Sequence, residues 1–134
     1  MKKKFTIIHE KKVASTNDFA KKMIAAEKLQ DFTIVSADNQ LIGRGQRRNS
    51  WHSKAKQNLT FSIVVYPDFL NATDQFYLSK SVSLGILDYL NSKGKEFKIK
   101  WPNDIYYENR KICGILIENA IAGIKIKSSV IGIG

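Results

Sequence analysis

The feature that most constrains the fold is a change of periodicity near Gly94. Before that residue, two stretches repeat apolar residues at helical spacing. After it, short apolar runs alternate with turns through residues 95–134. Strands that follow one another through short turns pair side by side in antiparallel order. The last third of the chain therefore predicts an antiparallel meander of four strands, with turns at "PND", "ENRK" and "NAIAG".

The residues before Gly94 add strands and helices in turn. Ser15, Thr16 and Asn17 stand where the first helix begins, and all three side chains can cap a helix. The expected elements are a strand over 5–10, a helix over 17–29, a strand over 32–37, a loop over 38–58, a strand over 59–67 and a helix that ends at Gly94.

This order predicts an α+β fold, with a mixed, mostly antiparallel sheet and the helices on one of its faces. The last expected strand is still apolar at Gly134. We therefore expect a chain that is truncated at its C-terminal side relative to its fold.

The net charge of +10 is distributed unevenly. Residues 1–57 contain 13 Lys/Arg and 5 Asp/Glu, whereas residues 58–134 contain 9 and 7. The excess indicates an anionic partner near the first half, which leaves nucleic acid, a phosphorylated small molecule or an acidic protein open. A solvated lysine face explains the same charge.

Other features of the composition indicate a cytoplasmic protein without a membrane partner. No apolar run reaches the roughly 20 residues that span a bilayer, and the apolar stretch after the first lysines is too short for an export signal. The single cysteine, Cys113, excludes an internal disulfide, which fits a reducing compartment.

The expected loop over 38–58 is rich in glycine and arginine. Gly43, Arg44 and Gly45 resemble the start of a dinucleotide fingerprint, but position 48 is arginine and no Walker sequence is present. Glycine lets backbone N–H groups approach an anion, and arginine offers forked donors for phosphate or carboxylate. An exposed basic loop with glycine turns is the alternative interpretation.

A second stretch, "KWPNDIYYENRKICGILIE", combines a turn with a carboxylate and a lysine. Asn103 and Asp104 form the turn, Lys111 begins the next strand and Gly114 follows. By itself this pattern is equally typical of an ordinary hairpin. His9 and His52 have no Cys/His cluster beside them, so we predict no metal site made of protein ligands.

Taken in order, three stretches resemble the catalytic domain of biotin–protein ligases. They are "STN" before a helix, "Q-x-x-GRG-x-R…W…NL", and "KWPND…K-x-x-GIL-x-E", which together run from about residue 13 to the end. The last is the most specific. The resemblance implies the class II synthetase-like fold of biotin and lipoate ligases. Residues 1–134 would be the N-terminal portion of the catalytic domain, without a DNA-binding domain or a C-terminal β-barrel domain.

The resemblance also implies roles for individual residues. Lys111 and Arg44 would be catalytic, and Arg47, Asn103, Asp104 and Gly132 would lie on the nucleotide side. The residues that match the family's biotin pocket are Ser15, Thr16, Asn17, Gln40, Gly43, Gly45, Trp51, Gly114, Ile115 and Leu116.

The implied reaction has two steps. The biotin carboxylate attacks the α-phosphate of ATP, with Mg²⁺ as activator, and forms biotinyl-5′-AMP; a lysine of a biotin carboxyl carrier protein then takes the biotinyl group. A lipoate or other acyl ligase, an inactive fragment and a basic nucleic-acid-binding module remain alternatives, with nucleic acid the least expected partner. An exposed edge on the "VIGIG" strand would allow a homodimer.

Two positions depart from the family pattern. Arg48 and Lys56 stand where glycine is usual in that family. If the backbone there has a positive φ, a side chain restricts it. We therefore expect closure of the loop to be altered.

Overall fold

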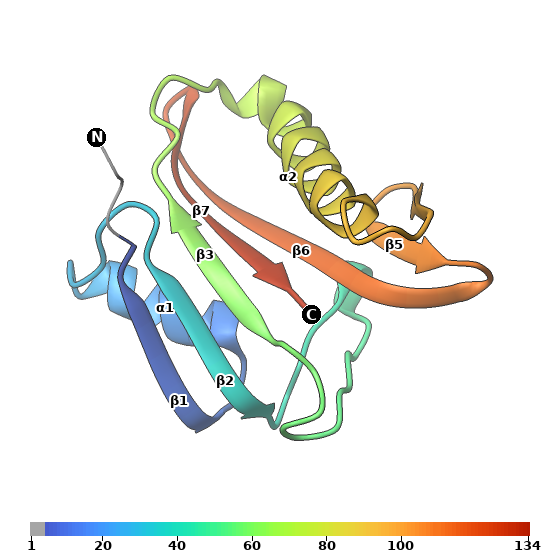
Figure 1. Ribbon diagram of the computed structural model, residues 1–134. Coiled ribbons are helices and arrows are strands. Elements are labelled where there is room, and N and C mark those ends of the chain that lie inside the picture. The colour runs from blue at the N-terminus through green and yellow to red at the C-terminus, as the bar shows by residue number, and fades with distance from the viewer. Residues whose placement is uncertain (1–4) are drawn as a thin grey trace.

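The computed structural model describes residues 5–134, which form a mixed seven-stranded sheet in the order β1-β2-β3-β7-β6-β5-β4 (Figure 1). The strands are β1 (Ile7–Val13), β2 (Ile34–Gln40), β3 (Phe61–Val65), β4 (Phe97–Lys100), β5 (Asp104–Tyr107), β6 (Arg110–Ala122) and β7 (Lys125–Ile133). The helices are α1 (Thr16–Ala25) and α2 (Gln75–Asn91), with short 3₁₀ turns η1 (Gln46–Arg48) and η2 (Ala72–Asp74).

The pairing confirms the predicted α+β class. β1 runs parallel to β2, and the remaining neighbours are antiparallel. The parallel pair follows from α1, which returns the chain to the same end of the sheet. Among the described residues, no helix combines the length and the apolar character needed to cross a membrane.

The two helices lie on opposite faces of the sheet, which corrects the prediction that they share one face. α1 packs on a core that includes Val64 and Val130, whereas α2 packs on one that includes Ile63 and Ile131. Successive residues of a strand project to opposite faces, so these two cores are separate. Figure 1 shows α1 behind the sheet and α2 in front of it.

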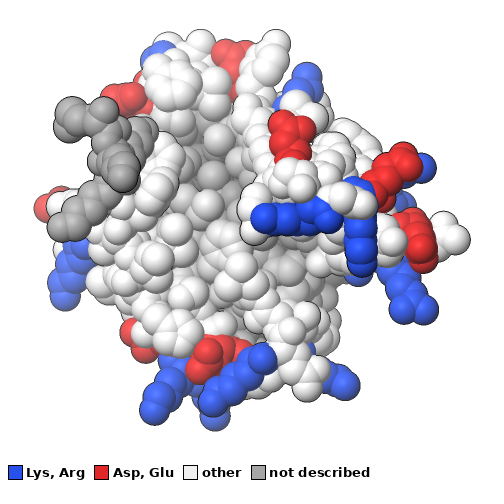
Figure 2. Space-filling model, in the orientation of Figure 1, with Lys and Arg blue, Asp and Glu red and all other residues white. Residues whose placement is uncertain are grey.

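Figure 2 shows basic and acidic side chains interspersed on the face in view, most of them near its margin and others on the right half. This face therefore offers no continuous basic surface of the kind that a nucleic-acid backbone requires.

Several element boundaries differ from the prediction by a few residues, and two of the differences have a clear cause in positive φ angles. α1 ends at Ala25 because Glu27 adopts a positive φ of 55° and closes the last turn, so the helix stops before Leu29. β6 continues through the predicted "NAIAG" connection as far as Ala122. The turn is made instead at Gly123, whose φ is 59°.

The "VIGIG" strand is not an edge. Residues 130–133 belong to β7, which pairs with β3 on one side and with β6 on the other. The exposed edge that would have allowed a homodimer through this strand is therefore not present. β1 and β4 are the edge strands of this sheet.

The two positions where the family usually has glycine do adopt left-handed backbone. The φ angle is 64° at Arg48 and 58° at Lys56. A side chain there costs roughly 1–2 kcal/mol relative to the right-handed region. The β2–β3 loop (residues 41–60) therefore carries local strain at both sites.

We predict that Lys56→Gly stabilises the protein by about 0.5–1 kcal/mol. Removing the left-handed strain outweighs the entropy that glycine adds to the unfolded chain. Lys54→Gly is the control, because Lys54 is also exposed but is not among the residues with a positive φ. Urea unfolding of both variants provides the measurement. A loss of stability in Lys56→Gly as large as that in Lys54→Gly would contradict the assignment of strain.

Candidate active site

A cavity of about 420 Å³ opens on the α1 face, where the start of α1, the β2–β3 loop and the ends of β6 and β7 meet. Its size is within the usual range for small-molecule sites. Its polar lining comes from Ser15, Thr16, Asn17, Gln40, Arg44, Gln46, Arg47, Asn49, Ser50, Thr60, Asn103, Asp104 and Lys111, and its remaining lining from Gly45, Trp51, Phe61, Trp101, Pro102, Gly114, Ile115, Leu116, Gly132, Ile133 and Gly134.

The structure brings nearly every predicted site residue to this one cavity. Arg44 and Lys111, which are 67 positions apart in the sequence, both line it. Gly43 is the exception, since it lies behind Trp51 and accepts a hydrogen bond from the Trp51 backbone N–H at 2.9 Å. The predicted set is therefore a spatial cluster drawn from five separate segments.

One part of the cavity is built by Ser15, Thr16 and Gln40. Ser15 caps α1 by accepting a hydrogen bond from the Asp18 backbone N–H, which confirms the predicted cap. The Thr16 backbone N–H and hydroxyl both lie within hydrogen-bond reach of Gln40 Oε1, at 2.7 and 3.1 Å. This fixes the orientation of the Gln40 amide. Within residues 5–134, its Nε2 group and the Ser15 hydroxyl proton are left for a ligand.

Asn17 is held from both ends of its amide. Its Nδ2 donates to a Glu118 oxygen at 2.8 Å and to the Leu116 carbonyl at 3.3 Å, while Ser62 Oγ lies 2.6 Å from its Oδ1. Because both N–H groups are used within the protein, only the Oδ1 oxygen is left to accept from a ligand. Gly132 packs against this amide, and a Cβ there would come 2.6 Å from Oδ1.

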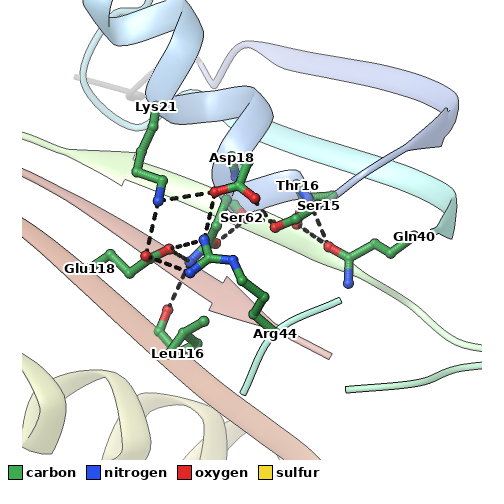
Figure 3. Close-up of polar contacts among 10 residues, drawn as sticks. Ser15, Thr16, Asp18, Lys21, Gln40, Arg44, Ser62, Leu116 and Glu118 are labelled. Carbon is green, nitrogen blue, oxygen red and sulfur yellow. Dashed lines mark hydrogen bonds and ion pairs between the residues drawn. The ribbon is translucent and has the colours of Figure 1, made fainter. Parts of the chain in front are cut away.

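Arg44 reaches across the α1 face to two carboxylates. It donates to Asp18 at 2.6 Å and to both oxygens of Glu118 at 3.0 Å, and Lys21 contacts the same two acids (Figure 3). We call these four residues the Arg44 cluster. Their formal charges cancel. The positive charge of Arg44, which is unbalanced within its own loop, is therefore offset by acids from elsewhere in the chain.

The hydrogen bonds of the Arg44 cluster shift its ionisation. Burial alone raises the pKa of Glu118, but hydrogen bonds from Arg44, Asn17 and Lys21 outweigh burial and lower that pKa to about 2. The hydrogen bond to Glu118 raises the pKa of Arg44, against the opposing effect of burial. Both groups are thus ionised throughout the neutral range.

Lys111 lies at another part of the cavity, where β5 and β6 pair. Its ammonium is 2.9 Å from Asp104 Oδ1. Asn103 anchors the preceding turn, because its Nδ2 donates to the Ile115 carbonyl at 2.9 Å and its own carbonyl accepts from the Ile115 N–H at 2.9 Å. A Cβ on Gly114 would lie 3.2 Å from the end of the Lys111 side chain. A glycine at 114 thus leaves room for the lysine.

Trp51 forms a wall of the cavity by packing over glycines. Its ring lies within 3.6 Å of the positions that Cβ atoms on Gly114 and Gly134 would occupy, and on Gly134 the approach would be a clash at 2.6 Å. The indole is therefore seated on bare backbone at the ends of β6 and β7. This packing fixes the middle of the β2–β3 loop beside Lys111.

Residues 10–134 match the biotin/lipoate A/B protein ligase family. The chain belongs to this family. The resemblance drawn from the three sequence stretches is therefore confirmed, and the cavity that these stretches build lies within the matched region.

Curated relatives in the biotin/lipoate ligase family carry biotin ligase names. The chain is 33% identical over 129 residues to the bifunctional ligase/repressor BirA of Bacillus subtilis, which covers 96% of this chain and 39% of the relative. It is 32% identical over 123 residues to the biotin–[acetyl-CoA-carboxylase] ligase of Paracoccus denitrificans. That match covers 90% of this chain and 50% of the relative.

Solved structures of biotin ligases share this fold. The Aquifex aeolicus biotin protein ligase in complex with biotin and ATP has a TM-score of 0.76 and 30% identity, over 96% of this chain and 52% of that one. The Helicobacter pylori synthetase with bound biotinylated ATP has a TM-score of 0.73 and 26% identity. The match covers 97% of this chain and 60% of that one. The chain thus spans about 40–60% of the length of these relatives.

Among the residues that the sequence analysis missed, three organise the site through their contacts. Ser62 is fully buried in β3. A serine within an otherwise apolar strand is the one sequence feature that could have pointed to its role. Glu118 stands within the quoted "GIL-x-E" stretch, yet no role was given to it. Asp18 lies in the first turn of α1, where an acidic residue is common for helix stability alone, so its position did not indicate a role in the site. Their shared function appears only when α1, β3 and β6 are brought together.

A protein-built metal centre does not appear in the described part of the chain. No group of three or more His, Cys, Asp or Glu side chains is arranged there to hold an ion. Asp104 is the one carboxylate among the described residues that line the cavity, and it pairs with Lys111. A Mg²⁺ ion would therefore depend mainly on ligands that a nucleotide supplies.

The lowered pKa of Glu118 predicts a pH-dependent contribution to stability. A depressed pKa contributes stability above the unfolded value of 4.5, and this contribution is lost as the pH falls towards about 2. The difference in unfolding free energy between wild type and Glu118→Gln should narrow by about 2 kcal/mol between pH 7 and pH 3.

Urea unfolding at the two pH values measures this difference. Glu96→Gln is the matched control, because Glu96 forms an exposed ion pair with Lys98 at 3.5 Å. If the stability gap between wild type and Glu118→Gln is the same at pH 3 as at pH 7, the hydrogen bonds to Glu118 do not hold its charge as described.

Proposed function

We propose that this chain carries the biotin- and ATP-binding site of a biotin–protein ligase, which forms biotinyl-5′-AMP and passes the biotinyl group to a lysine of a biotin carboxyl carrier protein. The observation that carries the proposal is the single cavity in which Ser15, Gln40, Arg44 and Lys111 meet. Family membership and the names of the relatives support it.

The hydrogen-bonding groups of the cavity favour biotin over lipoate. Biotin ends in a cyclic urea, which presents one carbonyl acceptor between two N–H donors. The Gln40 Nε2 group and the Ser15 hydroxyl can donate to that carbonyl, and Asn17 Oδ1 can accept from an N–H. The dithiolane ring of lipoate would leave the Gln40 Nε2 group and the Ser15 hydroxyl proton without a partner, at a cost of roughly 1–3 kcal/mol each.

The cations of the cavity suit the first chemical step. When the biotin carboxylate attacks the α-phosphate, negative charge gathers between two groups that already repel each other. Arg44 has five N–H donors and uses three on Asp18 and Glu118, so two remain for a carboxylate or phosphate. Lys111, held by Asp104, places an ammonium in the same cavity. Mg²⁺, bound to the phosphates of ATP, would supply further charge neutralisation.

The second step needs the mixed anhydride to survive until an acceptor amine arrives. Water must be kept from it, and a closed loop is the usual means. The β2–β3 loop provides Gly45, Arg47 and Trp51 to the cavity wall and is braced by hydrogen bonds between Gly45 and Asn49 and between Trp51 and Gly43. Attack by the lysine nitrogen on the acyl carbon then releases AMP.

Incubation of the protein with ATP, Mg²⁺ and biotin, followed by mass spectrometry, tests the proposal. Biotinyl-5′-AMP should form, and calorimetry should show tighter binding of biotin than of lipoate. Lys111→Ala should lower the rate of adenylate formation by about 10²–10³-fold while biotin still binds. Lys127→Ala, an exposed lysine on β7, should leave the rate within about twofold.

Tighter binding of lipoate would overturn the substrate assignment. Adenylate formation at the wild-type rate by Lys111→Ala would overturn the role of this lysine. Absence of both biotin binding and adenylate in the wild-type protein would overturn the proposed activity for this chain.

A further inference from the structure

Glu118 occupies a position between the two halves of the proposed site. One of its oxygens, Oε2, accepts from Asn17 Nδ2 at 2.8 Å and from Arg44 Nη2 at 3.0 Å. Its other oxygen accepts from Arg44 Nη1 at 3.0 Å and from Lys21 at 2.9 Å. Glu118 itself does not line the cavity. It therefore touches residues on both sides of the ligand site without reaching the ligand.

The contacts on the α1 side form a directed chain. An amide oxygen only accepts, so the single proton of the Ser62 hydroxyl is best used towards Asn17 Oδ1, at 2.6 Å. The Thr16 hydroxyl lies 2.7 Å from Ser62 Oγ and 3.1 Å from Gln40 Oε1. A carboxylate at the other end accepts from Asn17 Nδ2. The Leu116 carbonyl accepts from the same Nδ2 at 3.3 Å, so Glu118 and this carbonyl together determine which way the Asn17 amide faces.

The contacts on the loop side depend on the same carboxylate. Arg44 is the residue of the β2–β3 loop that reaches both Asp18 and Glu118, through the guanidinium fork. If the loop opens, Glu118 loses two charge-assisted hydrogen bonds while it remains partly buried, with its side chain 24% exposed. An open loop therefore weakens the electrostatic setting in which Asn17 is held.

We infer that Glu118 is a positioning residue that couples closure of the β2–β3 loop to binding of biotin at the Ser15–Asn17 side of the cavity. The inference rests on the proposed function for the identity of the ligand. A ligand that needs the Asn17 amide in its present orientation favours the state in which Arg44 is bound to Glu118. Coupling of this kind is reciprocal, so a closed loop also raises the affinity for biotin.

Hydrogen–deuterium exchange measures the loop directly. The backbone N–H groups of Gly45 and Trp51 donate within the loop at 2.7 and 2.9 Å, so their exchange reports its closure. In the wild-type protein, saturating biotin should slow exchange at these two amides by about tenfold or more.

Glu118→Gln tests whether Glu118 couples the loop to biotin binding, as distinct from only stabilising the fold. The variant keeps the size of the side chain but cannot accept at both oxygens, so biotin affinity should fall by about tenfold. Saturating biotin should then slow exchange of Gly45 and Trp51 by less than about twofold. Glu96→Gln, which alters an exposed acid that pairs with Lys98 just before β4, should behave as wild type in both measurements.

The outcomes distinguish this inference from the proposed function. If wild-type protein does not bind biotin, the proposed function fails first. If wild-type protein binds biotin and Glu118→Gln shows the same affinity and the same biotin-dependent protection, the coupling inference is overturned.

Arg44→Lys provides a second test that does not depend on the folding of Glu118→Gln. This variant leaves the bonds of Glu118 with Asn17 and Lys21 in place but removes the fork. Biotin should then slow exchange at Gly45 and Trp51 by less than about twofold. Full biotin-dependent protection in Arg44→Lys would likewise overturn the inference.

Discussion

One carboxylate, that of Glu118, is the contact on which the α1 face of the sheet depends. It projects from β6 into a partly buried position where an unpaired charge would cost several kcal/mol. The donors that satisfy it come from two other segments, with Asn17 and Lys21 on α1 and Arg44 on the β2–β3 loop. Pairing this charge therefore fixes where the helix and the loop sit over the sheet, and the cavity is the space left between them.

Charge in this protein is balanced in space more than in sequence. The first half of the chain carries a clear excess of lysine and arginine, and residues 41–63 contain no acid. Yet the arginine of that loop is held by Asp18, 26 positions earlier, and by Glu118, 74 positions later. Lys111 is likewise paired with Asp104. What the site offers an anion is a set of oriented donors, together with the guanidinium of Arg47, which also lines the cavity.

Local patterns were enough to predict what local chemistry determines. The Ser15 cap and the strands of the meander each follow from a few neighbouring residues, whereas the left-handed backbone at Arg48 and Lys56 was suggested by the glycine that the resembling family usually has there. The end of α1 and the β6–β7 turn were misplaced because single residues, Glu27 and Gly123, decide them through positive φ angles.

The long-range features were beyond the reach of those patterns. The face that each helix covers depends on how the chain crosses the sheet, which alternation along a strand does not reveal. Ser62 and Glu118 acquire their roles only through contacts with α1. Their shared partner there is Asn17, which is 45 positions from Ser62 and 101 positions from Glu118. With the exception of Gly43, the residues that the resemblance to biotin–protein ligases singled out line one cavity. A family resemblance reflects three-dimensional proximity that composition and periodicity do not contain.

The most direct test of this account is a double-mutant cycle between Arg44 and Glu118, measured by urea unfolding at pH 7. Wild type, Arg44→Met, Glu118→Gln and the double variant are compared. The account predicts a coupling free energy of about 1–3 kcal/mol, because the loss of either partner leaves the other without its main counter-charge. Effects that add to within about 0.5 kcal/mol would show that the two residues act independently, and would contradict the claim that this pair joins the loop to the sheet.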